Sequence, residues 1–502
     1  MNLYWGDLHN HCGITYGFGS LENALAAARE QLDFCAIIGH AMWPDMPEKT
    51  EELEFLVDFH MKGFAKLQKN WEYVRRTVSE SNIPHQFVTF QGYEIHSSEF
   101  GDHHILSPSD ELPLIQADSP AKLVEALAPL PVIAVPHHVG YTPGYRGVNW
   151  DAFAEEISPV VEVFSKHGCS MSDSSPYPYL HTMGPRDSRN TIVSALQRGK
   201  RFSFAGSTDH HAGYPGSYGD GRVAVMAAEK TREAIWEALL ARRTYAVTGD
   251  KIVCQFTLNG AIYGSEVKDS GCRQLKLDVT ACDGIEKVTV YKNGKSWSIV
   301  NGVSAGSQAQ QPSNAQGRYK VRVEMGWGEN KDGFLWNGRA RLDGGQIVSL
   351  ETCFRGQSVL APTPEMRDNP DINALSNKLI SSSDNSAVWT CTTFKNPSTQ
   401  HPQTAALIFE IDGDLNSKLA IEANGQTFAY SIGELLTGSR SAHLEAYNSE
   451  AVLFHRAVPE NEYCFQGEWS DDQKETDCDA YHVEIKQWNG QCAWISPVFV
   501  LA

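Results

Sequence analysis

Residues 3–11 read LYWGDLHNH, and this stretch sets the pattern for the first half of the chain. Its apolar and aromatic residues, which end at Leu8, are typical of a buried strand. His9 and His11 follow directly, and residues two apart in extended backbone share one face. The stretch therefore predicts a buried strand that ends in a cluster of chemically active side chains.

The same succession of a buried strand, a polar cluster and an amphipathic helix recurs through residue 248. Further strands are predicted at Asp33–Ile38, Gln86–Gln91, Val132–Val135, Val160–Ser165, Phe202–Ala205 and Thr244–Val247. Helices are predicted at Ser20–Leu32, Pro47–Ser81, Ser119–Leu127, Asn190–Gly199 and Thr231–Arg242. This alternation favours a parallel sheet, and seven or eight such units favour a β/α barrel over the open sheet that the pattern also allows.

Beyond about residue 250 the helical periodicity nearly disappears and short alternating runs replace it. Lys287–Ile299 is predicted as a hairpin, because alternating residues flank Asn293-Gly294, a pair favoured in tight type I′ turns. Further strands are predicted at Tyr319–Met325, Ile347–Cys353, Ala405–Ile411, Tyr481–Gln487 and Cys492–Val500. The acidic segment Glu460–Asp479 is predicted as a solvated loop. We therefore expect an α/β barrel over residues 1–250 and an all-β, sandwich-like domain over residues 251–502.

The composition is that of an ordinary globular protein, with 41% hydrophobic and 21% charged residues. A formal charge of -19 opposes binding to a phosphate backbone, so no nucleic-acid partner is expected. The N-terminus lacks the pattern of a signal peptide, and no apolar run is long enough to cross a bilayer. The 11 cysteines form no CxxC pair, which argues against a disulfide framework or a cysteine zinc site. We expect a cytoplasmic protein without a membrane partner, and the oligomeric state is left open.

Histidine is distributed unevenly, since 14 of the 18 histidines lie in the first 211 residues. Eight of those 14 stand with acids where predicted strands end: Asp7, His9 and His11; His40; Glu94; His137 and His138; His167; and Asp209, His210 and His211. In a parallel barrel all these points lie on one rim. Each cluster alone is more often a packing or surface feature than a ligand set. Five or six strand ends that all carry such residues, however, predict a site for several divalent metal ions.

The residues at these positions resemble the PHP (polymerase and histidinol phosphatase) superfamily. The resemblance rests on GDLHNH at residues 6–11, His40, the Glu94 motif, the pair at 137–138, His167 and STDHH at residues 207–211. YWGDLHNH near the start and QCAWISPVFV near the end are similar to a branch of carbaryl-hydrolase-like metallohydrolases. The resemblance covers residues 3–250. It implies a distorted seven-stranded, TIM-like β/α barrel that holds two or three ions, typically zinc, manganese or iron.

The resemblance also implies which residues hold each metal. His9, His11, Glu94 and Asp209 would hold one metal, Glu94 would bridge to a second metal on His137 (or His138) and His167, and His40 and His211 would belong to a third. The chain departs from the family pattern at Tyr16 and Gly17, where an acid or histidine usually stands, and at Ile38, where the usual string is TDH. We therefore expect two complete sites. The third is expected to be incomplete, weak, or completed by Tyr16, a water or another residue.

Two neighbouring metals can supply a bridging hydroxide and polarise a substrate oxygen. The expected function is therefore a metal-dependent hydrolase of a small-molecule ester, foremost a phosphoesterase that works through Glu94 and Asp209. A carboxyl or carbamate esterase on the same site is an alternative. A metal-stabilised binding or accessory protein without catalysis is the alternative of another class. An amidohydrolase barrel fits the Glu94 position and the Asp-x-His ending less well.

A few further residues are candidates for chemistry. Contacts to a phosphate or oxyanion could come from Lys166, Arg186, Arg146 and Arg222, although most basic side chains are solvated. His104, like its neighbour His103, is a candidate acid for the leaving group. A GxSxG string at residues 302–306 lacks the strand-turn-helix context of a nucleophile elbow and is interpreted as chance. The role of the β-rich half is not predicted.

Overall fold

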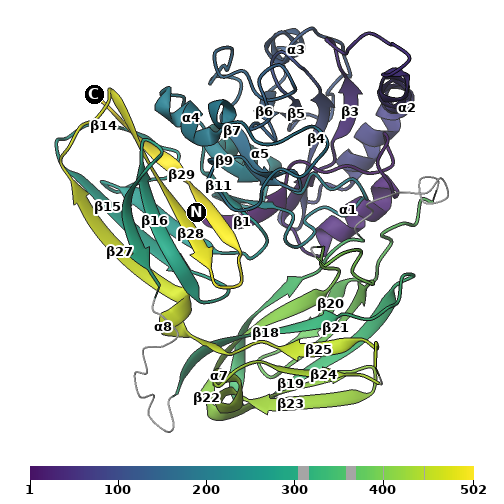
Figure 1. Ribbon diagram of the computed structural model, residues 1–502, viewed down its shortest axis with the longest axis vertical. Coiled ribbons are helices and arrows are strands. Elements are labelled where there is room, and N and C mark those ends of the chain that lie inside the picture. The colour runs from purple at the N-terminus through teal and green to yellow at the C-terminus, as the bar shows by residue number, and fades with distance from the viewer. Residues whose placement is uncertain (303–315, 358–368, 400, 446) are drawn as a thin grey trace.

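The computed structural model describes residues 1–302, 316–357, 369–399, 401–445 and 447–502 (Figure 1). The first half of the chain forms an α/β region, beside which lie a β-sandwich and a further large sheet. Within the described residues, no helix is long and apolar enough to cross a membrane. Most of the GxSxG string falls outside the described residues.

The α/β region contains the predicted alternation together with several short strands that were not predicted. Its strands are β1 (Asn2–Asp7), β2 (Phe34–Ala36), β3 (Gly39–Met42), β4 (Val88–Ile95), β5 (His103–Ser107), β6 (Ile133–Pro136), β7 (Val160–Ser165), β8 (Gly168–Cys169), β9 (Ser203–Gly206), β10 (Arg222–Ala227) and β11 (Thr244–Val247). Its helices are α1 (Leu21–Arg29), α2 (Glu54–Glu80), α3 (Pro120–Leu127), α4 (Ile192–Gln197) and α5 (Arg232–Leu240), with a 3₁₀ turn at Ser188–Asn190. The seven predicted strands and five predicted helices of this half are present, with limits within about four residues except at α2, which begins at Glu54 instead of Pro47. The strands β3, β5, β8 and β10 were missed.

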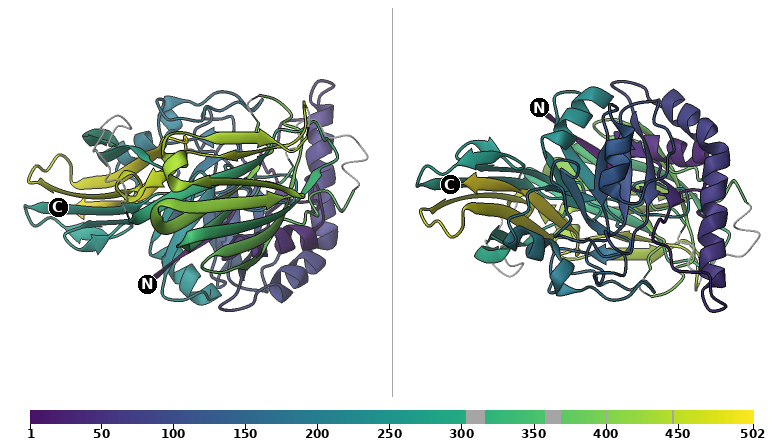
Figure 2. Two further views of the ribbon diagram at one scale, coloured as in Figure 1. Left: turned by 90° about the horizontal axis from the view of Figure 1, so that it is seen from below. Right: turned by 90° about the horizontal axis from the view of Figure 1, so that it is seen from above.

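Four of the five α-helices of this region, all except α2, begin at a serine or threonine that caps them. The hydroxyl of Ser20 accepts from the backbone N–H of Asn23 at the start of α1, and Thr231 does the same for α5. The segment predicted at Pro47–Ser81 forms a single 27-residue helix, α2, which runs along the outer edge of the α/β region (Figure 2). Its buried side includes Leu67, Trp71 and Val74, at the spacing of one helical face.

The predicted all-parallel closed barrel is not what the strands form. The pairs β1–β2, β2–β4, β3–β4 and β7–β9 are parallel, but β4–β5, β5–β6, β1–β10 and β10–β11 are antiparallel. In the described chain, β6 ends the large sheet and does not pair with the separate β8-β7-β9 sheet, although β6 and β7 lie in contact. Of the antiparallel pairs, only β4–β5 is joined by a short connection, while β5–β6 and β10–β11 are joined through helices and β1–β10 are far apart in the chain. The region is therefore a mixed α/β fold without a closed barrel.

A β-sandwich formed by the beginning and end of the second half continues the large sheet. Its strands are β12 (Val253–Leu258), β13 (Ala261–Ile262), β14 (Glu266–Lys268), β15 (Arg273–Thr280), β16 (Ile285–Lys292), β17 (Lys295–Asn301), β27 (Cys464–Asp471), β28 (Cys478–Gln487) and β29 (Cys492–Leu501). The four-stranded sheet β13-β12-β15-β27 packs on β17-β16-β28-β29 across one apolar core. Because β29 also pairs with β11, the sandwich and the α/β region share a 13-stranded sheet. The domain boundary at residue 250 stays a prediction.

The chain between β17 and β27 forms a separate nine-stranded sheet, drawn lowest in Figure 1. Its strands are β18 (Gly317–Gly326), β19 (Phe334–Cys353), β20 (Lys378–Ser382), β21 (Ser386–Thr393), β22 (Ala405–Ala423), β23 (Gln426–Ser431), β24 (Arg440–His443), β25 (Ala451–Phe454) and β26 (Val458–Pro459), with the helices α7 (Ile432–Leu436) and α8 (Glu460–Tyr463). The prediction of a solvated loop at Glu460–Asp479 holds for residues 472–477, which are exposed, but is wrong for residues 460–471. This segment contains α8 and β27, and β27 pairs with β15 along its whole length, with alternate side chains such as Phe465 and Trp469 packed against the sandwich core.

Candidate metal centre

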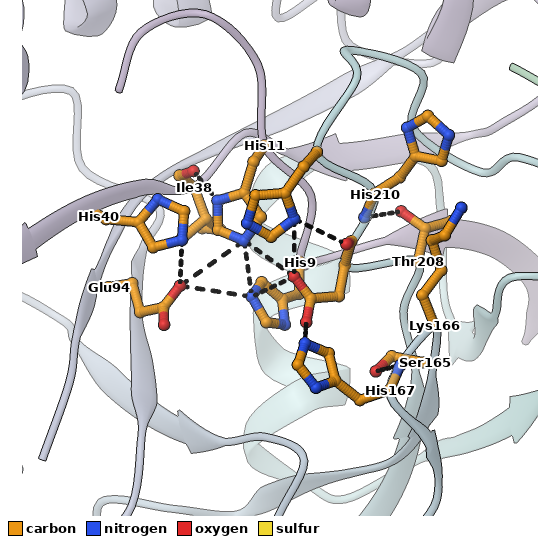
Figure 3. A network of polar contacts seen from close by, with 12 residues as sticks. His9, His11, Ile38, His40, Glu94, Ser165, Lys166, His167, Thr208 and His210 are labelled. Atoms are coloured by element: carbon orange, nitrogen blue, oxygen red, sulfur yellow. Dashed lines mark hydrogen bonds and ion pairs between the residues drawn. The ribbon is translucent and has the colours of Figure 1, made fainter. Parts of the chain in front are cut away.

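The polar clusters that follow the predicted strands meet in one place (Figure 3). The residues brought together are His9 and His11 after β1, His40 in β3, Glu94 in β4, His137 and His138 after β6, His167 after β7, and Asp209 and His211 after β9. Most of these side chains are buried, while His167 is 13% and His211 is 36% exposed. His210, by contrast, turns its ring away from this cluster, and its Nδ1 accepts from the backbone N–H of Ala212.

The Nε2 atoms of His9 and His11 lie 3.1 Å apart, and the two ring planes are nearly perpendicular, at 78°. Nδ1 of His11 lies 2.7 Å from the carbonyl oxygen of Ile38, which can only accept, so this Nδ1 donates. Nδ1 of His9 lies 2.8 Å from a carboxylate oxygen of Glu162. In the neutral rings both Nε2 atoms therefore carry lone pairs that point at each other. The repulsion between these lone pairs is relieved by a proton on one of them or by a cation bound between them.

Two carboxylates border the same space. Oδ1 of Asp209 lies 3.1 Å from Nε2 of His11, and Oε2 of Glu94 lies 3.6 Å from it. Burial alone would raise the pKa of Glu94, but His96, His40 and His137 outweigh it and hold the pKa well below its usual value. The pKa of Asp209 is likewise lowered, because His9 and His167 outweigh its burial. Both groups are therefore anions at neutral pH.

Glu94 lies at the middle of the cluster. Its Oε1 is 3.2 Å from Nε2 of His137, and its Oε2 is 3.5 Å from Nε2 of His40. Oε2 has no hydrogen-bond partner among the described residues, although it is fully buried. Burying a carboxylate oxygen without a hydrogen-bond donor costs free energy, and coordination of a cation would offset that cost.

The residues predicted for a third metal also gather, and Tyr16 lies with them. The ring of Tyr16 stacks on His40 with centroids 3.9 Å apart, and the His11 and His211 rings are 4.2 Å apart. The phenol oxygen of Tyr16 lies 3.1 Å from Nε2 of His96. A hollow of about 320 Å³ opens on the other side of Tyr16, along α2.

The pair His137 and His138 contributes in two directions. His137 faces Glu94, whereas Nε2 of His138 lies 3.5 Å from Oδ2 of Asp102. The ring of His138 also lies beside that of His167, with centroids 4.6 Å apart. Nε2 of His167 in turn is 3.0 Å from Oδ2 of Asp209. The two histidines thus lie next to different carboxylates, and either can serve as a ligand.

Several of these ligand atoms form compact sets. Triads whose atoms all lie within 4.8 Å of one another include His9, His11 and Asp209; His11, His40 and His211; His40, Glu94 and His96; His9, His104 and His137; and Asp102, His137 and His138. All ligand atoms are imidazole nitrogens or carboxylate oxygens, the donors that zinc, manganese and iron accept. Burial lowers the pKa of His40, His104 and His138, so these rings are neutral and able to coordinate at pH 7.

Sequence reasoning missed three members of the cluster. His96 stands two residues beyond Glu94, and its Nδ1 lies 3.0 Å from both Glu94 and Asp102. Asp102 is buried directly before β5, and Glu162 in the middle of β7 holds His9. The spacing of His96 from Glu94 was a usable signal. For Glu162 the only signal in the sequence was the presence of an acid inside an apolar strand.

The other side chains that were predicted to take part in catalysis have different surroundings. His104 is fully buried, with Nδ1 3.2 Å from Nδ1 of His137. Nζ of Lys166 lies 3.7 Å from Asp220, and the guanidinium of Arg186 donates to the carbonyls of Cys169, Asp173 and Ser175. The Arg222 guanidinium is buried against Gly216, Gly249 and Gln31. Arg146 contacts the cluster itself, through Asp102 and His96.

The loop that carries Asp209 is fixed from two sides. Asp7 accepts from the backbone N–H and the hydroxyl of Thr208. On the far side, Nδ2 of Asn373 donates to the carbonyl of Ala212, 2.6 Å away. Asn373 belongs to the connection between β19 and β20, so the nine-stranded sheet unit helps to hold this loop.

Comparisons with known proteins find a family match over part of the chain. Residues 200–274 match a family described as a protein of unknown function (DUF3604), and this stretch includes Asp209 and His211. The chain is 28% identical over 274 residues to an uncharacterised protein of Chlamydia pneumoniae, with 48% of this chain and 43% of the relative covered. A relative in Chlamydia trachomatis is 26% identical over 288 residues, with 53% and 42% covered. The chain thus spans less than half the length of these curated relatives.

Two solved structures are similar at low levels. One, from Bacteroides vulgatus, is a two-domain protein described as containing a predicted PHP-like metal-dependent phosphoesterase. It has a TM-score of 0.34 and 16% identity, with 58% of this chain and 79% of that chain covered. The other, a lesion-specific endonuclease of Pyrococcus furiosus, has a TM-score of 0.29 and 10% identity, with 48% and 56% covered. At these TM-scores the likeness does not establish a shared fold, so the function has to be argued from the cluster itself.

Proposed function

We propose that this chain is a divalent-metal-dependent hydrolase of the PHP superfamily, and that it acts on phosphate esters of small molecules. The observation that carries the proposal is the pair of facing Nε2 atoms of His9 and His11, 3.1 Å apart and bordered by Asp209 and Glu94. Both Nδ1 atoms are engaged elsewhere, so lone pairs converge on a space with two anionic groups beside it. A divalent cation at this point would accept both nitrogen lone pairs and balance the two carboxylate charges.

The compact triads support two of the expected sites: His9, His11 and Asp209 with Glu94 would hold one ion, and His40 with His211 another, to which His96 lies close enough to contribute. The remaining set, Glu94 with His137 (or His138) and His167, is what the family resemblance implies; His137 lies beside Glu94, and His167 beside Asp209. Zinc, manganese or iron suits this set of nitrogen and oxygen donors. When bound, such ions lower the pKa of a coordinated water towards neutrality and polarise a substrate oxygen.

The surrounding residues of the chain orient the ligands. Glu162 and the Ile38 carbonyl fix the tautomers of His9 and His11, and the hydroxyl of Tyr141 lies 2.6 Å from Nδ1 of His167. Partners of this kind keep metal-binding imidazoles in one orientation and raise their basicity. The predicted roles of Lys166 and Arg186 in substrate binding, and of His104 as an acid, stay predictions.

A hydrolysis panel on the full chain tests the proposal. The protein, loaded with zinc or manganese, is assayed on p-nitrophenyl phosphate, bis-p-nitrophenyl phosphate, naphthyl acetate and a naphthyl carbamate. We expect phosphate-ester turnover that a chelator removes and added metal restores. Turnover of the acetate or carbamate alone would replace the phosphoesterase by the carboxyl-ester alternative. Stoichiometric metal without any turnover would favour a binding or accessory protein.

Glu94→Gln isolates the contribution of the central carboxylate. The variant keeps the shape of the side chain but removes the charge that faces His40 and His137, so we expect turnover to fall by about 100-fold or more. Glu99→Gln, at an exposed position nearby in the sequence, is the matched control and should keep full activity. Unchanged activity in Glu94→Gln would refute the assignment of the site.

A further inference from the structure

Arg146 is a basic residue whose charged group reaches the metal centre from outside the predicted ligand set. It stands in the loop after β6, and its Nε donates to Oδ2 of Asp102 over 2.7 Å. Its Nη2 lies 2.6 Å from Nδ1 of His96, and its guanidinium lies over the ring of Trp43, 5.2 Å from the centroid. The side chain is 15% exposed, so it lies at the boundary between the buried cluster and solvent.

The backbone around Arg146 is set in an uncommon conformation. Arg146 has φ of +68°, which residues other than glycine rarely adopt, and Gly144, two residues earlier, has φ of +80°. A Cβ at Gly147 would lie 1.9 Å from the carbonyl oxygen of Tyr141, and that carbonyl accepts from Asn190 over 2.8 Å. The loop is thus closely packed and tied to its neighbours. Strained residues held by a rigid frame are common where a side chain must be aimed at a site.

The guanidinium still has donors to offer. Asp102 and His96 engage Nε and Nη2, while Nη1 faces only the sulfur of Met183 at 3.5 Å among the described residues. A thioether is a weak acceptor, so an oxyanion would be a much better partner for the two N–H groups of Nη1. The ion pair with Asp102 holds the guanidinium of Arg146 in place, so little conformational entropy of this side chain is lost when an anion binds.

The other basic candidates of the sequence contact groups outside the metal cluster. Arg186 donates to three loop carbonyls, Arg222 is buried under Gly216, and Lys166 lies beside Asp220. Of these four side chains, Arg146 alone contacts members of the metal cluster. The centre itself is rich in buried carboxylates, so a fixed cation at its edge also favours an incoming anion over a neutral group.

We propose that Arg146 binds the anionic group of the substrate at the edge of the metal centre through Nη1, and that it thereby selects phosphate esters over neutral esters. This inference rests on the proposed function and adds the group that recognises the substrate. It places the phosphoryl oxygens between the metal ligands and the guanidinium. A neutral acetate or carbamate would gain little from that position.

Binding of inorganic phosphate to the metal-loaded full chain tests this inference without requiring catalysis. Calorimetric titration should show phosphate binding to the wild type, weakened about 10-fold to 100-fold in Arg146→Met, as expected for a lost charged hydrogen bond. Arg146→Lys should fall between the two, because a lysine keeps the charge but loses the planar fork. Arg189→Met removes an exposed arginine that pairs with Asp187 and should bind phosphate as the wild type does.

Metal analysis of each variant separates recognition from collapse of the site. If Arg146→Met keeps its metal, a phosphate affinity equal to that of the wild type overturns the inference. If Arg146→Met loses metal, Arg146→Lys at full metal content is compared instead, and an affinity equal to that of the wild type overturns the inference. A wild type that does not bind phosphate also overturns it. In hydrolysis assays, Arg146→Met should lose at least about 10-fold in kcat/KM on p-nitrophenyl phosphate and less than about twofold on naphthyl acetate. Equal losses of activity on both substrates would mean that Arg146 has a structural role only. A wild type that binds phosphate and metal but hydrolyses neither substrate would refute the proposed function, while the inference about phosphate binding would remain.

Discussion

Residues outside the set of candidate metal ligands determine which nitrogen atoms of the cluster can bind a cation. Glu162 and the Ile38 carbonyl each take up an Nδ1–H, so that the Nε2 atoms of His9 and His11 are left as acceptors. The pKa of His9 is raised, because the charges of Asp209 and Glu162 outweigh burial. The protein thus favours a positive charge at this point, which a bound cation supplies as well as a proton does.

Glu162→Gln should weaken metal binding without unfolding the protein. The amide cannot accept from Nδ1 of His9 with the strength of a carboxylate, so the imidazole becomes a poorer ligand. We expect metal affinity to fall by about 10-fold to 100-fold, measured by competition with a chromogenic chelator. Glu156→Gln, an exposed acid in the preceding loop, should leave the affinity unchanged. Equal affinities in Glu162→Gln and wild type would contradict the role given to Glu162.

His482 should make the stability depend on pH far from the metal centre. It is fully buried in β28, stacks on Tyr291, and its ring nitrogens have no hydrogen-bond partner among the described residues. Burial lowers its pKa to about 3, so the unfolded chain takes up a proton below pH 6.5 that the folded chain refuses. Stability is therefore lost as the pH falls from 6.5 towards 3, by about 2 kcal/mol from this residue at pH 5. His482→Phe should lose less stability than wild type between pH 7 and pH 5 in urea unfolding, and identical losses would count against this assignment.

The candidate ligands could be predicted from the sequence because they stand where strands end. His9, His11 and Asp209 were visible for that reason, and the structure brings them together. Asp102 and Glu162 could not be predicted in the same way. Each becomes part of the site only through the side chain that it meets in space, and a sequence does not show which neighbour an isolated acid has.

At the scale of elements, strand positions were easier to predict than strand directions. β7 and β11 have the predicted limits because their apolar runs are bounded by polar residues and turns. β5 and β10 were missed, and both are antiparallel to their neighbours, so the expected closed parallel barrel was wrong. β5 contains His103 and His104 and lacks a helix before it, which hid it from a search for alternating strands and helices.

Two of the tight Asn-Gly hairpins allow a matched test of turn geometry. Asn293-Gly294 was predicted as a type I′ turn, and both residues have positive φ, 51° and 72°. Asn424-Gly425 has the same signs, with 48° and 85°. A Cβ at Gly425 would meet nothing within 4 Å, whereas one at Gly294 would lie 2.8 Å from Val193 in α4.

Gly425→Ala should therefore cost only the strain of the left-handed conformation, about 1 kcal/mol of unfolding free energy. Gly294→Ala should cost about 1–3 kcal/mol more, because the methyl group must displace Val193. Urea unfolding of both variants measures the difference. A smaller loss in Gly294→Ala than in Gly425→Ala would contradict this packing of the hairpin on α4.

For the whole molecule, the second half is less separate than its composition suggested. β29 pairs with β11, and the nine-stranded sheet reaches the loop of Asp209 through Asn373. A change of secondary-structure type near residue 250 was visible in the sequence. The insertion of one sheet unit between β17 and β27 was not, because strand patterns do not show which distant strands pair.

A buried ion pair connects the nine-stranded sheet to the rest of the chain. Arg322 in β18 donates to Asp250 over 2.6 Å and to the hydroxyl of Tyr218 over 2.7 Å, all three being buried. Arg322→Met leaves the Asp250 carboxylate without its cation and should cost about 3–5 kcal/mol of unfolding free energy. Arg322→Met combined with Asp250→Asn should recover part of that loss in urea unfolding. A single variant as stable as wild type would show that the pair does not hold the two parts together.

The metal content of the purified full chain tests the central claim most directly. The protein is saturated with zinc or manganese and dialysed against metal-free buffer, and its metal content is measured by inductively coupled plasma mass spectrometry. The cluster around His9, His11, Glu94 and Asp209 predicts roughly two to three ions per chain, and the loss of at least about one of them in Glu94→Gln. Less than one ion per wild-type chain would contradict the account.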